Sequence, residues 1–264
     1  MKKILLPTDF SEIAEYALEY AAFFAKRTNG TLHIVSVIKS KNEKIRAITQ
    51  EKLNELTEKS YLKNIKIETH IKTGDSIKSS IVNCAKEIDV DLIIMGSNGA
   101  SLFGEIMLGS NTEKVIRKTN YSVLTIKHQM ISLKLGSIAF ASDFSTPKNK
   151  AFHVVRDLAK LFNSTIHLLK INTPNHFEPT RLSLQKMDAF IKEQKLDELE
   201  CKYKVALYSD SNEELGILNF CIENNMDMIS IGTTGKKAVW KLLNDSTSQS
   251  LVNHSFRPVL TIKL

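Results

Sequence analysis

The sequence predicts an α/β protein with two tandem domains, each a five-stranded, mostly parallel sheet with helices on both faces. Short apolar segments rich in β-branched residues alternate with longer segments whose apolar residues recur at helical spacing. The whole pattern starts again near Leu135, so we expect one domain over residues 1–130 and a second over residues 131–264. No apolar run approaches the length that a membrane-spanning helix needs.

The repeat is visible in four pairs of segments. The register between the halves drifts by only two residues from the first pair to the last. The linking residues, 128–134, lack Gly and Pro, which predicts closely coupled domains rather than a free tether. The pairs are residues 9–11 and 143–145 (both DFS), 31–33 and 165–167 (TLH and TIH), 95–99 and 231–235 (MGSNG and IGTTG), and 123–127 and 259–263 (both VLTIK).

The first half begins with a short strand that ends in Pro-Thr-Asp, followed by a helix. Ser11 has the position of the helix N-cap, and we expect Gly30 to end the helix. Helical spacing gives this helix one apolar face, formed by Ala14, Ala17, Leu18, Ala21, Phe24 and Ala25. Further strands are expected at residues 31–38, 65–71, 92–95 and 122–127.

The segment from residue 41 to residue 62 is long and highly charged, which predicts an exposed amphipathic helix. Its apolar residues, Ile45, Ile48, Leu53 and Leu56, fall on roughly one side. Alternation over residues 65–71 is typical of a strand near a sheet edge, and Gly74-Asp75-Ser76 should turn the chain and cap the next helix.

The composition is that of a soluble globular protein, with 42% hydrophobic and 25% charged residues. The start MKKILLPTDF has an apolar patch too short for a signal peptide, so we expect a cytoplasmic protein. Net charge is +7, but the lysines are dispersed, which makes nucleic acid an unlikely partner. Cys84, Cys201 and Cys221 form neither a disulfide framework nor a zinc pattern.

The stretch from Asp91 to Thr125 carries the main functional signal. A short apolar strand is followed at once by Gly96 and Gly99, and Gly109-Ser110 then stands at the head of a helical pattern. Glycines at such a place let backbone amides approach a ligand, and the first turn of a helix offers unpaired N–H groups and partial positive charge. The pattern therefore predicts a phosphate site.

Two residues separate Gly96 from Gly99, and nine more separate Gly99 from Gly109-Ser110. This spacing resembles the nucleotide-binding signature of the universal stress protein family. The following TEKVIRKTNYSVLTIK resembles that family's last helix and strand, and no Walker A loop is present. The resemblance covers nearly the whole chain, one module in each half. It implies Rossmann-like, adenine nucleotide alpha hydrolase-like domains, ATP as ligand and a role in stress response. It also implies intramolecular pairing of the halves through residues 122–127 and 258–263, and it leaves a further homodimer open.

Carried over from the family, the strand end Pro7-Thr8-Asp9 contributes to the nucleotide site. Asp9 would accept hydrogen bonds from the ribose or adenine, at the carboxyl edge where open α/β sheets bind ligands. The alternative for Asp9 is a turn aspartate. Val37 would contact adenine through its backbone, and Met95 would line the base pocket. The alternative for both is ordinary core packing.

The phosphate end of the site is assigned to Gly96, Gly99, Gly109 and the first turn of the following helix. Gly96 and Gly99 could also be ordinary loop glycines. Ser110 and Glu113 have the spacing of a capping box, which is compatible with phosphate binding. Candidate phosphate contacts on the same turn are Ser110, Asn111 and Thr112.

The second half departs from the signature. Gly232, Gly235 and Ser246 are kept, but Asp245 stands where the third glycine should be. A carboxylate there would repel a phosphate, and it makes a good N-cap instead. We therefore expect ATP in the first half and a degenerate second site.

Metal and catalytic residues give weaker signals. His33 and His167 recur mid-strand, where packed or surface imidazoles are usual, and the sequence shows no His, Cys and carboxylate cluster for a structural metal. Mg²⁺ accompanying a bound triphosphate follows from the resemblance and from phosphate chemistry. The sequence shows no recognisable lysine finger or arginine finger and no residue that would orient an attacking water, so we assign no catalytic residues. The alternatives to a nucleotide-dependent regulator are a slow ATPase or other nucleotide hydrolase, and a nucleotide-independent scaffold or polyanion binder.

Overall fold

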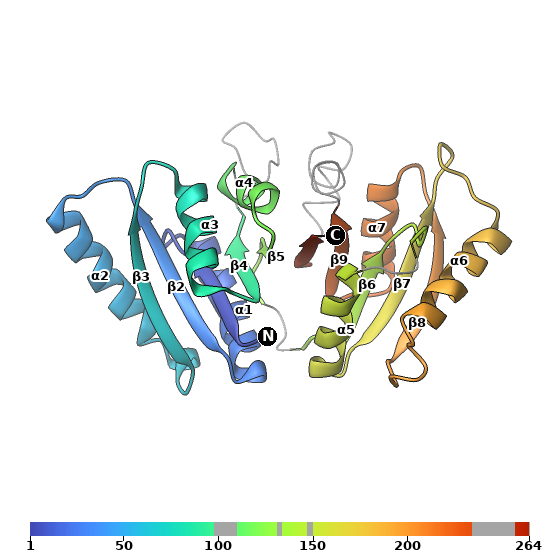
Figure 1. Cartoon of the computed structure of the whole chain (residues 1–264), viewed down its shortest axis with the longest axis horizontal. Coiled ribbons are helices and arrows are strands. Elements are labelled where there is room, and N and C mark those ends of the chain that lie inside the picture. The colour runs from blue at the N-terminus through green and yellow to red at the C-terminus, as the bar shows by residue number, and fades with distance from the viewer. Residues whose placement is uncertain (98–109, 131–133, 147–149, 234–256, 264) are drawn as a thin grey trace. The chain divides into compact units, whose positions relative to one another are not determined.

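A computed structural model of the chain describes residues 1–97, 110–130, 134–146, 150–233 and 257–263. These residues form two compact units. Unit 1 comprises the described residues up to 130, and unit 2 comprises those from 134 onward. Figure 1 shows that each unit is a sheet covered by helices on both faces.

Unit 1 contains five parallel strands in the spatial order β3-β2-β1-β4-β5. Helices α1 and α2 cover one face of this sheet, and α3 and α4 cover the other (Figure 1). The strands are β1 (Lys3–Pro7), β2 (Thr31–Ile38), β3 (Lys66–Thr73), β4 (Leu92–Gly96) and β5 (Ser122–Ile126). The helices are α1 (Glu12–Thr28), α2 (Glu43–Thr57), the short η1 (Ser60–Leu62), α3 (Ile77–Ile88) and α4 (Ser110–Lys118).

Unit 2 repeats this arrangement with strands in the order β10-β9-β6-β7-β8, again all parallel. Its strands are β6 (Ser137–Ala141), β7 (Thr165–Asn172), β8 (Tyr203–Ser209), β9 (Met228–Thr233) and β10 (Val259–Lys263). Its described helices are α5 (Lys150–Phe162), α6 (Thr180–Glu193) and α7 (Glu213–Glu223). The predicted α/β fold class is confirmed.

The two units also agree in register. Pro7 of β1 lies opposite Val35 of β2, and Ala141 of β6 lies opposite Leu169 of β7, so equivalent positions in these strands differ by the same sequence offset. Each sheet uses an aspartate to hold the start of its first strand. Asp91 accepts the backbone N–H of Lys3 at 2.9 Å, and Asp227 accepts that of Ser137 at the same distance.

The first helix forms as the sequence predicts, with one correction at its end. Ser11 caps α1 by accepting the N–H of Ala14, and all six predicted apolar positions are buried. The left-handed residue that ends α1 is Asn29, with φ of 48°, rather than Gly30. Gly30 is required for space instead, because a Cβ there would lie 2.9 Å from the carbonyl oxygen of Lys2.

The predicted helix over residues 41–62 is shorter and less buried than expected. α2 ends at Thr57, and the last part of the segment forms η1. Leu53 and Leu56 are buried, but Ile45 and Ile48 are exposed. The buried residues of α2 are Thr49, Leu53 and Leu56, so its first turn and a half stays exposed. None of the described helices is long and apolar enough to cross a bilayer.

Candidate functional site

The described members of the predicted site lie at the carboxyl ends of β1, β2 and β4 and at the start of α4. Strands β1 and β4 are neighbours in the sheet, with Ile4 opposite Leu92 and Leu5 opposite Ile93. After β1 the chain adds β2 and β3 on one side of β1, and it then crosses over to add β4 and β5 on the other side. The point where the strand order reverses therefore lies between β1 and β4. Open α/β sheets bind ligands at the carboxyl ends of strands at such a switch point.

The turn after β1 is built by its own side chains. The Thr8 hydroxyl accepts the N–H of Phe10 at 3.0 Å, and the Asp9 carboxylate accepts the N–H of Ser11 at 3.1 Å. Phe10 is left-handed, with φ of 62°. Asp9 is exposed, so it has the turn role considered from the sequence while its carboxylate still faces solvent at the carboxyl edge.

Val37 presents its backbone beyond the end of β1. The β1–β2 ladder ends with Pro7 opposite Val35, and the Val35 carbonyl accepts the N–H of Thr8 at 2.9 Å. Alternate residues of a strand point their N–H and C=O groups to the same side, so those of Val37 point past the turn of residues 8–10. This backbone edge can offer a donor and an acceptor to a planar base.

Gly96 is needed for packing, which favours the non-ligand interpretation of this glycine. A Cβ on Gly96 would lie 2.7 Å from the carbonyl oxygen of Ile13, in the first turn of α1. The absence of a side chain therefore lets the end of β4 pass close to α1. Met95, just before it, is buried with 5% of its surface exposed, as core packing requires.

Thr112 ties the first turn of α4 to the end of β4. Its hydroxyl donates to the carbonyl oxygen of Gly96 at 2.9 Å, and the residue is 3% exposed. The first N–H groups of a helix have no partner within it, so the start of α4 brings anion-binding amides to the same edge as Asp9. Since the hydroxyl donates to Gly96, a phosphate contact from Thr112 would use its backbone. Gly99 and Gly109 lie outside the described residues, as do the side chains of Ser110, Asn111 and Glu113.

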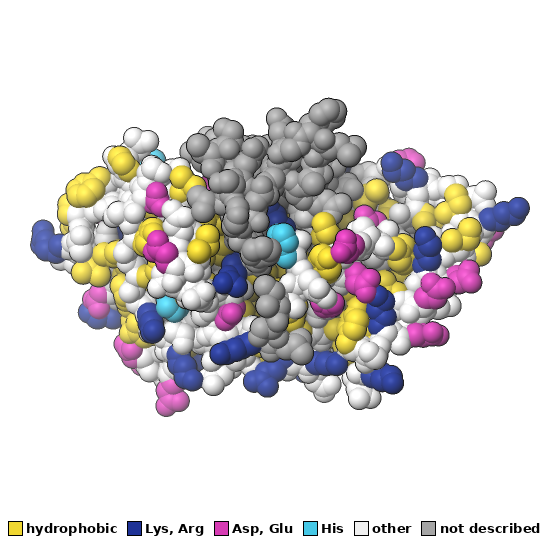
Figure 2. Space-filling model, turned by 180° about the vertical axis from the view of Figure 1, so that it is seen from behind, with side chains coloured by type: hydrophobic (Ala, Val, Ile, Leu, Met, Phe, Trp, Pro, Cys, Tyr) yellow, Lys and Arg dark blue, Asp and Glu magenta, His cyan; other side chains and the backbone are white. Residues whose placement is uncertain are grey.

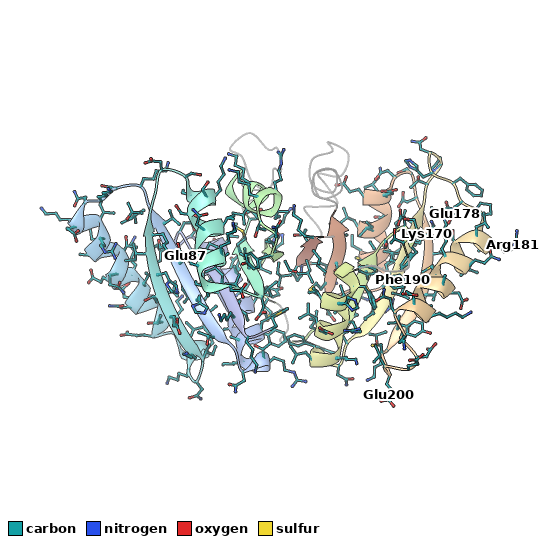
Figure 3. The ribbon with its side chains drawn as sticks, viewed as in Figure 1. Glu87, Lys170, Glu178, Arg181, Phe190 and Glu200 are labelled. Atoms are coloured by element: carbon teal, nitrogen blue, oxygen red, sulfur yellow. The ribbon has the colours of Figure 1, made fainter. Side chains whose placement is uncertain are left out.

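Unit 2 keeps the turn but changes its surroundings. Asp143 accepts the N–H of Ser145 at 3.0 Å, and Phe144 has φ of 54°, as at the equivalent turn of unit 1. Lys170 occupies the position that register equates with Ser36 of β2. Its ammonium lies 3.4 Å from the Asp143 carbonyl oxygen and 2.8 Å from the carboxylate of Glu178 (Figure 3).

Glu178 is the centre of this polar cluster. Besides Lys170, its carboxylate accepts from Lys186 and, at 2.9 Å, from the hydroxyl of Ser183. Hydrogen bonds from Lys170 and Lys186 lower the pKa of Glu178 to about 2. Unit 2 therefore carries a buried lysine and its counter-ion beside the turn where unit 1 has a small hydroxyl. Asp245 and Ser246 lie outside the described residues.

Sequence reasoning missed a second group of polar side chains in unit 1. The sheet brings His33 of β2 together with Glu68 and His70 of β3, with their nearest ligand atoms all within 4.8 Å of one another. The sequence alone does not reveal this cluster, because residues 33 and 68 become neighbours only through strand pairing. The available signal was the alternation of Glu68 and His70, which places both on one face of a strand.

The comparisons with known proteins agree with this architecture. The model of the universal stress protein family matches residues 1–127 and again residues 135–263. The chain belongs to the universal stress protein family. The resemblance seen at the glycine spacing is thereby confirmed, with one family module in each half of the chain.

Individual universal stress proteins match one half of the chain or all of it. MJ0577 of Methanocaldococcus jannaschii is 36% identical over 155 residues, which cover 48% of this chain and 96% of that protein. Slr1230 of Synechocystis is 23% identical over 295 residues, and the match covers 100% of both proteins. The crystal structure of a universal stress protein from Archaeoglobus fulgidus has a TM-score of 0.77 at 25% identity and covers 99% of this chain and 96% of its own.

Proposed function

We propose that unit 1 binds an adenine nucleotide, ATP in the first instance, and that the chain is a nucleotide-dependent regulator of the stress response. The observation that carries the proposal is the bond between Thr112 and Gly96, because it fixes the start of α4 at the β1–β4 switch point. This edge combines hydrogen-bonding groups suited to a base, to a ribose and to phosphates.

Each part of the nucleotide has a suitable partner at this edge. The backbone of Val37 suits the adenine ring, and the exposed carboxylate of Asp9 suits hydroxyl donors of the ribose. The amides at the start of α4 suit the phosphates, with Gly99 and Gly109 expected to let the backbone approach them. A Mg²⁺ ion would use phosphate oxygens as its main ligands and neutralise part of their charge.

We further propose that unit 2 does not hold ATP. Lys170 and Glu178 stand beside its turn, and Asp245 adds a negative charge where the phosphates would lie. Unit 2 then serves as a partner for unit 1 through β5 and β10, each of which is an edge strand of its own unit. A cytoplasmic location and a homodimer of the whole chain stay predictions.

Two alternatives have less support. Hydrolysis needs a placed cation or a residue that orients water, and the sequence shows no recognisable one. A polyanion binder needs a basic patch, whereas Lys and Arg side chains are interspersed with Asp and Glu on the face seen in Figure 2. A slow ATPase remains the second candidate, since the same amides would stabilise charge on the phosphates.

Calorimetric titration with ATP and Mg²⁺ tests the proposal. We expect one ATP per chain, and a loss of affinity of at least about tenfold in Asp9→Asn, since an amide binds hydroxyl donors less strongly than a carboxylate. Asparagine can still accept the N–H of Ser11, so this change preserves the turn. The matched variant Asp143→Asn should bind like the wild type.

A second pair of variants tests the phosphate end. Gly109→Asp copies Asp245 and should abolish ATP binding, whereas Asp245→Gly should leave the affinity of unit 1 unchanged. Unaltered ATP affinity in both Asp9→Asn and Gly109→Asp would disprove the site. Phosphate release above that of Gly109→Asp would favour the hydrolase.

A further inference from the structure

The cluster of His33, Glu68 and His70 lies on the face of the unit 1 sheet that α3 covers. Lys72, two residues after His70 on the same face of β3, pairs with Glu87 of α3. Figure 3 labels Glu87. His33 stands near the start of β2, about 13 Å before Val37 along the strand, and His70 lies opposite Val35, about 7 Å before it. The cluster is therefore separate from the proposed nucleotide edge.

We propose that His33, Glu68 and His70 form a binding site for a divalent transition-metal ion of the zinc class. The proposal assigns three protein ligands, Nδ1 of His33, Nε2 of His70 and Oε2 of Glu68. A water molecule supplies the fourth ligand, because Glu68 is 44% exposed and the site opens to solvent at the edge strand β3.

The spacing of the ligand atoms suits a tetrahedral ion. Nδ1 of His33 lies 3.2 Å from Nε2 of His70 and 3.4 Å from Oε2 of Glu68. An ion with bonds of about 2.1 Å requires ligand atoms to stand roughly 3.4 Å apart in tetrahedral geometry. All three atoms already lie within 4.8 Å of one another, so a small movement of the exposed Glu68 side chain completes the set.

The surroundings favour neutral imidazoles, which are the form that binds metal. Burial lowers the pKa of both His33 and His70, and His33 is 5% exposed. Two imidazoles with one carboxylate suit Zn²⁺, Co²⁺, Ni²⁺ or Cu²⁺ rather than Mg²⁺ or Ca²⁺, which prefer all-oxygen sites.

Two features limit the affinity of this site. Lys3 and Lys66 disfavour positive charge on His33, and Lys72 does so on His70. Two of these lysines already have carboxylate partners, because Lys66 pairs with Glu68 at 3.3 Å and Lys72 pairs with Glu87. Nε2 of His33 is buried with no hydrogen-bond partner among the described residues. An outer partner on a ligating histidine typically strengthens binding by about 10–100-fold, so we expect a moderate rather than a tight site.

A hydrogen bond between the two imidazoles is the alternative use of the same geometry. In that case one ring donates and the other accepts, and no ion is needed. The alternative explains the contact between His33 and His70, and Glu68, which pairs with Lys66, is not required for it. The role of Glu68 therefore separates the two interpretations.

Unit 2 provides a built-in comparison. His167 stands at the position equivalent to His33, opposite Lys204 of β8, and Ala206 lies opposite Leu169. In unit 1, Glu68 lies opposite His33, and His70 lies opposite Val35. Lys204 and Ala206 thus replace Glu68 and His70, so unit 2 keeps the recurring histidine without the other two ligands.

The test is Zn²⁺ binding by the full chain, after removal of any affinity tag, in competition with a chromophoric chelator. We expect one Zn²⁺ per chain in the wild type. Glu68→Lys and His70→Ala copy unit 2 and should each weaken binding by at least about tenfold. His167→Ala, which removes the equivalent histidine, should leave the affinity unchanged.

Two controls keep the result interpretable. Thermal unfolding without metal should be similar in all variants, and His70→Gln replaces His70→Ala if the smaller side chain disturbs the fold. The visible spectrum of bound Co²⁺ should report nitrogen and oxygen ligands in the wild type and disappear in the two unit 1 variants. The proposal is overturned if the wild type takes up no Zn²⁺, or if Glu68→Lys and His70→Ala bind Zn²⁺ as the wild type does.

Discussion

The hydroxyl of Thr112 donates a hydrogen bond of 2.9 Å to the carbonyl oxygen of Gly96. The bond joins the first turn of α4 to the last residue of β4. Replacing Thr112 by the isosteric valine should destabilise unit 1 by about 1–3 kcal/mol, because a partly buried carbonyl loses its donor. ATP affinity should fall as well, since the start of α4 is no longer fixed.

A nearby threonine supplies the control for this change. The Thr125 hydroxyl is buried with no hydrogen-bond partner among the described residues, so Thr125→Val should be neutral or stabilising. Urea unfolding and ATP titration of both variants measure the difference. Equal stability of the two variants would contradict the role assigned to Thr112.

Gly96 should tolerate substitution poorly for a steric reason. The Cβ of Gly96→Ala would lie 2.7 Å from the backbone oxygen of Ile13, which can move only if α1 moves. We expect a loss of about 1–3 kcal/mol in the free energy of unfolding. Gly74→Ala is the matched control in the same unit, because its Cβ would meet the Ser80 hydroxyl, which can rotate away. A loss in Gly74→Ala as large as that in Gly96→Ala would show that the clash is not the cause.

Sequence reasoning succeeded where local patterns determine the structure. The apolar spacing of α1, the cap at Ser11 and the internal repeat are read from neighbouring residues, and all three are present in the fold. It was less accurate at element ends. Asn29 rather than Gly30 takes the left-handed conformation, because an asparagine tolerates positive φ and the next residue needs space beside Lys2.

Features that depend on strand pairing could not be read from the sequence. His33 and Glu68 are 35 positions apart, and only the register between β2 and β3 makes them neighbours. The contact between Lys170 and the turn at Asp143 depends in the same way on the register between β6 and β7. The glycine spacing that predicts the loops of the candidate site is local, and that prediction stays untested because Gly99 and Gly109 lie outside the described residues. The bond between Thr112 and Gly96 could be found only from the fold.

The cluster around Glu178 should make the stability of unit 2 depend on pH. The pKa of Glu178 is about 2 in the folded chain and about 4.5 without its partners, so the ionised form is favoured by folding. Its stabilising effect is complete above about pH 4.5 and is lost as the pH falls toward about 2.

Glu178→Gln tests this dependence. The variant leaves Lys170 buried without its carboxylate and should lose about 1–3 kcal/mol at neutral pH. Urea unfolding should show the gap between wild type and variant shrinking at about pH 3.5. Glu198→Gln, which affects only an exposed pair with Lys195, should change little at either pH. A gap that is the same at both pH values would mean that the charge of Glu178 is not what stabilises the cluster.

The three free cysteines should differ sharply in reactivity. Cys84 and Cys221 are fully buried, and burial raises the pKa of Cys221 to about 12, so neither offers an accessible thiolate. Cys201 is partly exposed, just before β8, although burial raises the pKa of its thiol too. A thiol-specific chromogenic disulfide should therefore label one cysteine in the native chain and all three after denaturation. Cys201→Ser should remove the native reaction, and rapid labelling that persists in this variant would place the reactive thiol in one of the two cores.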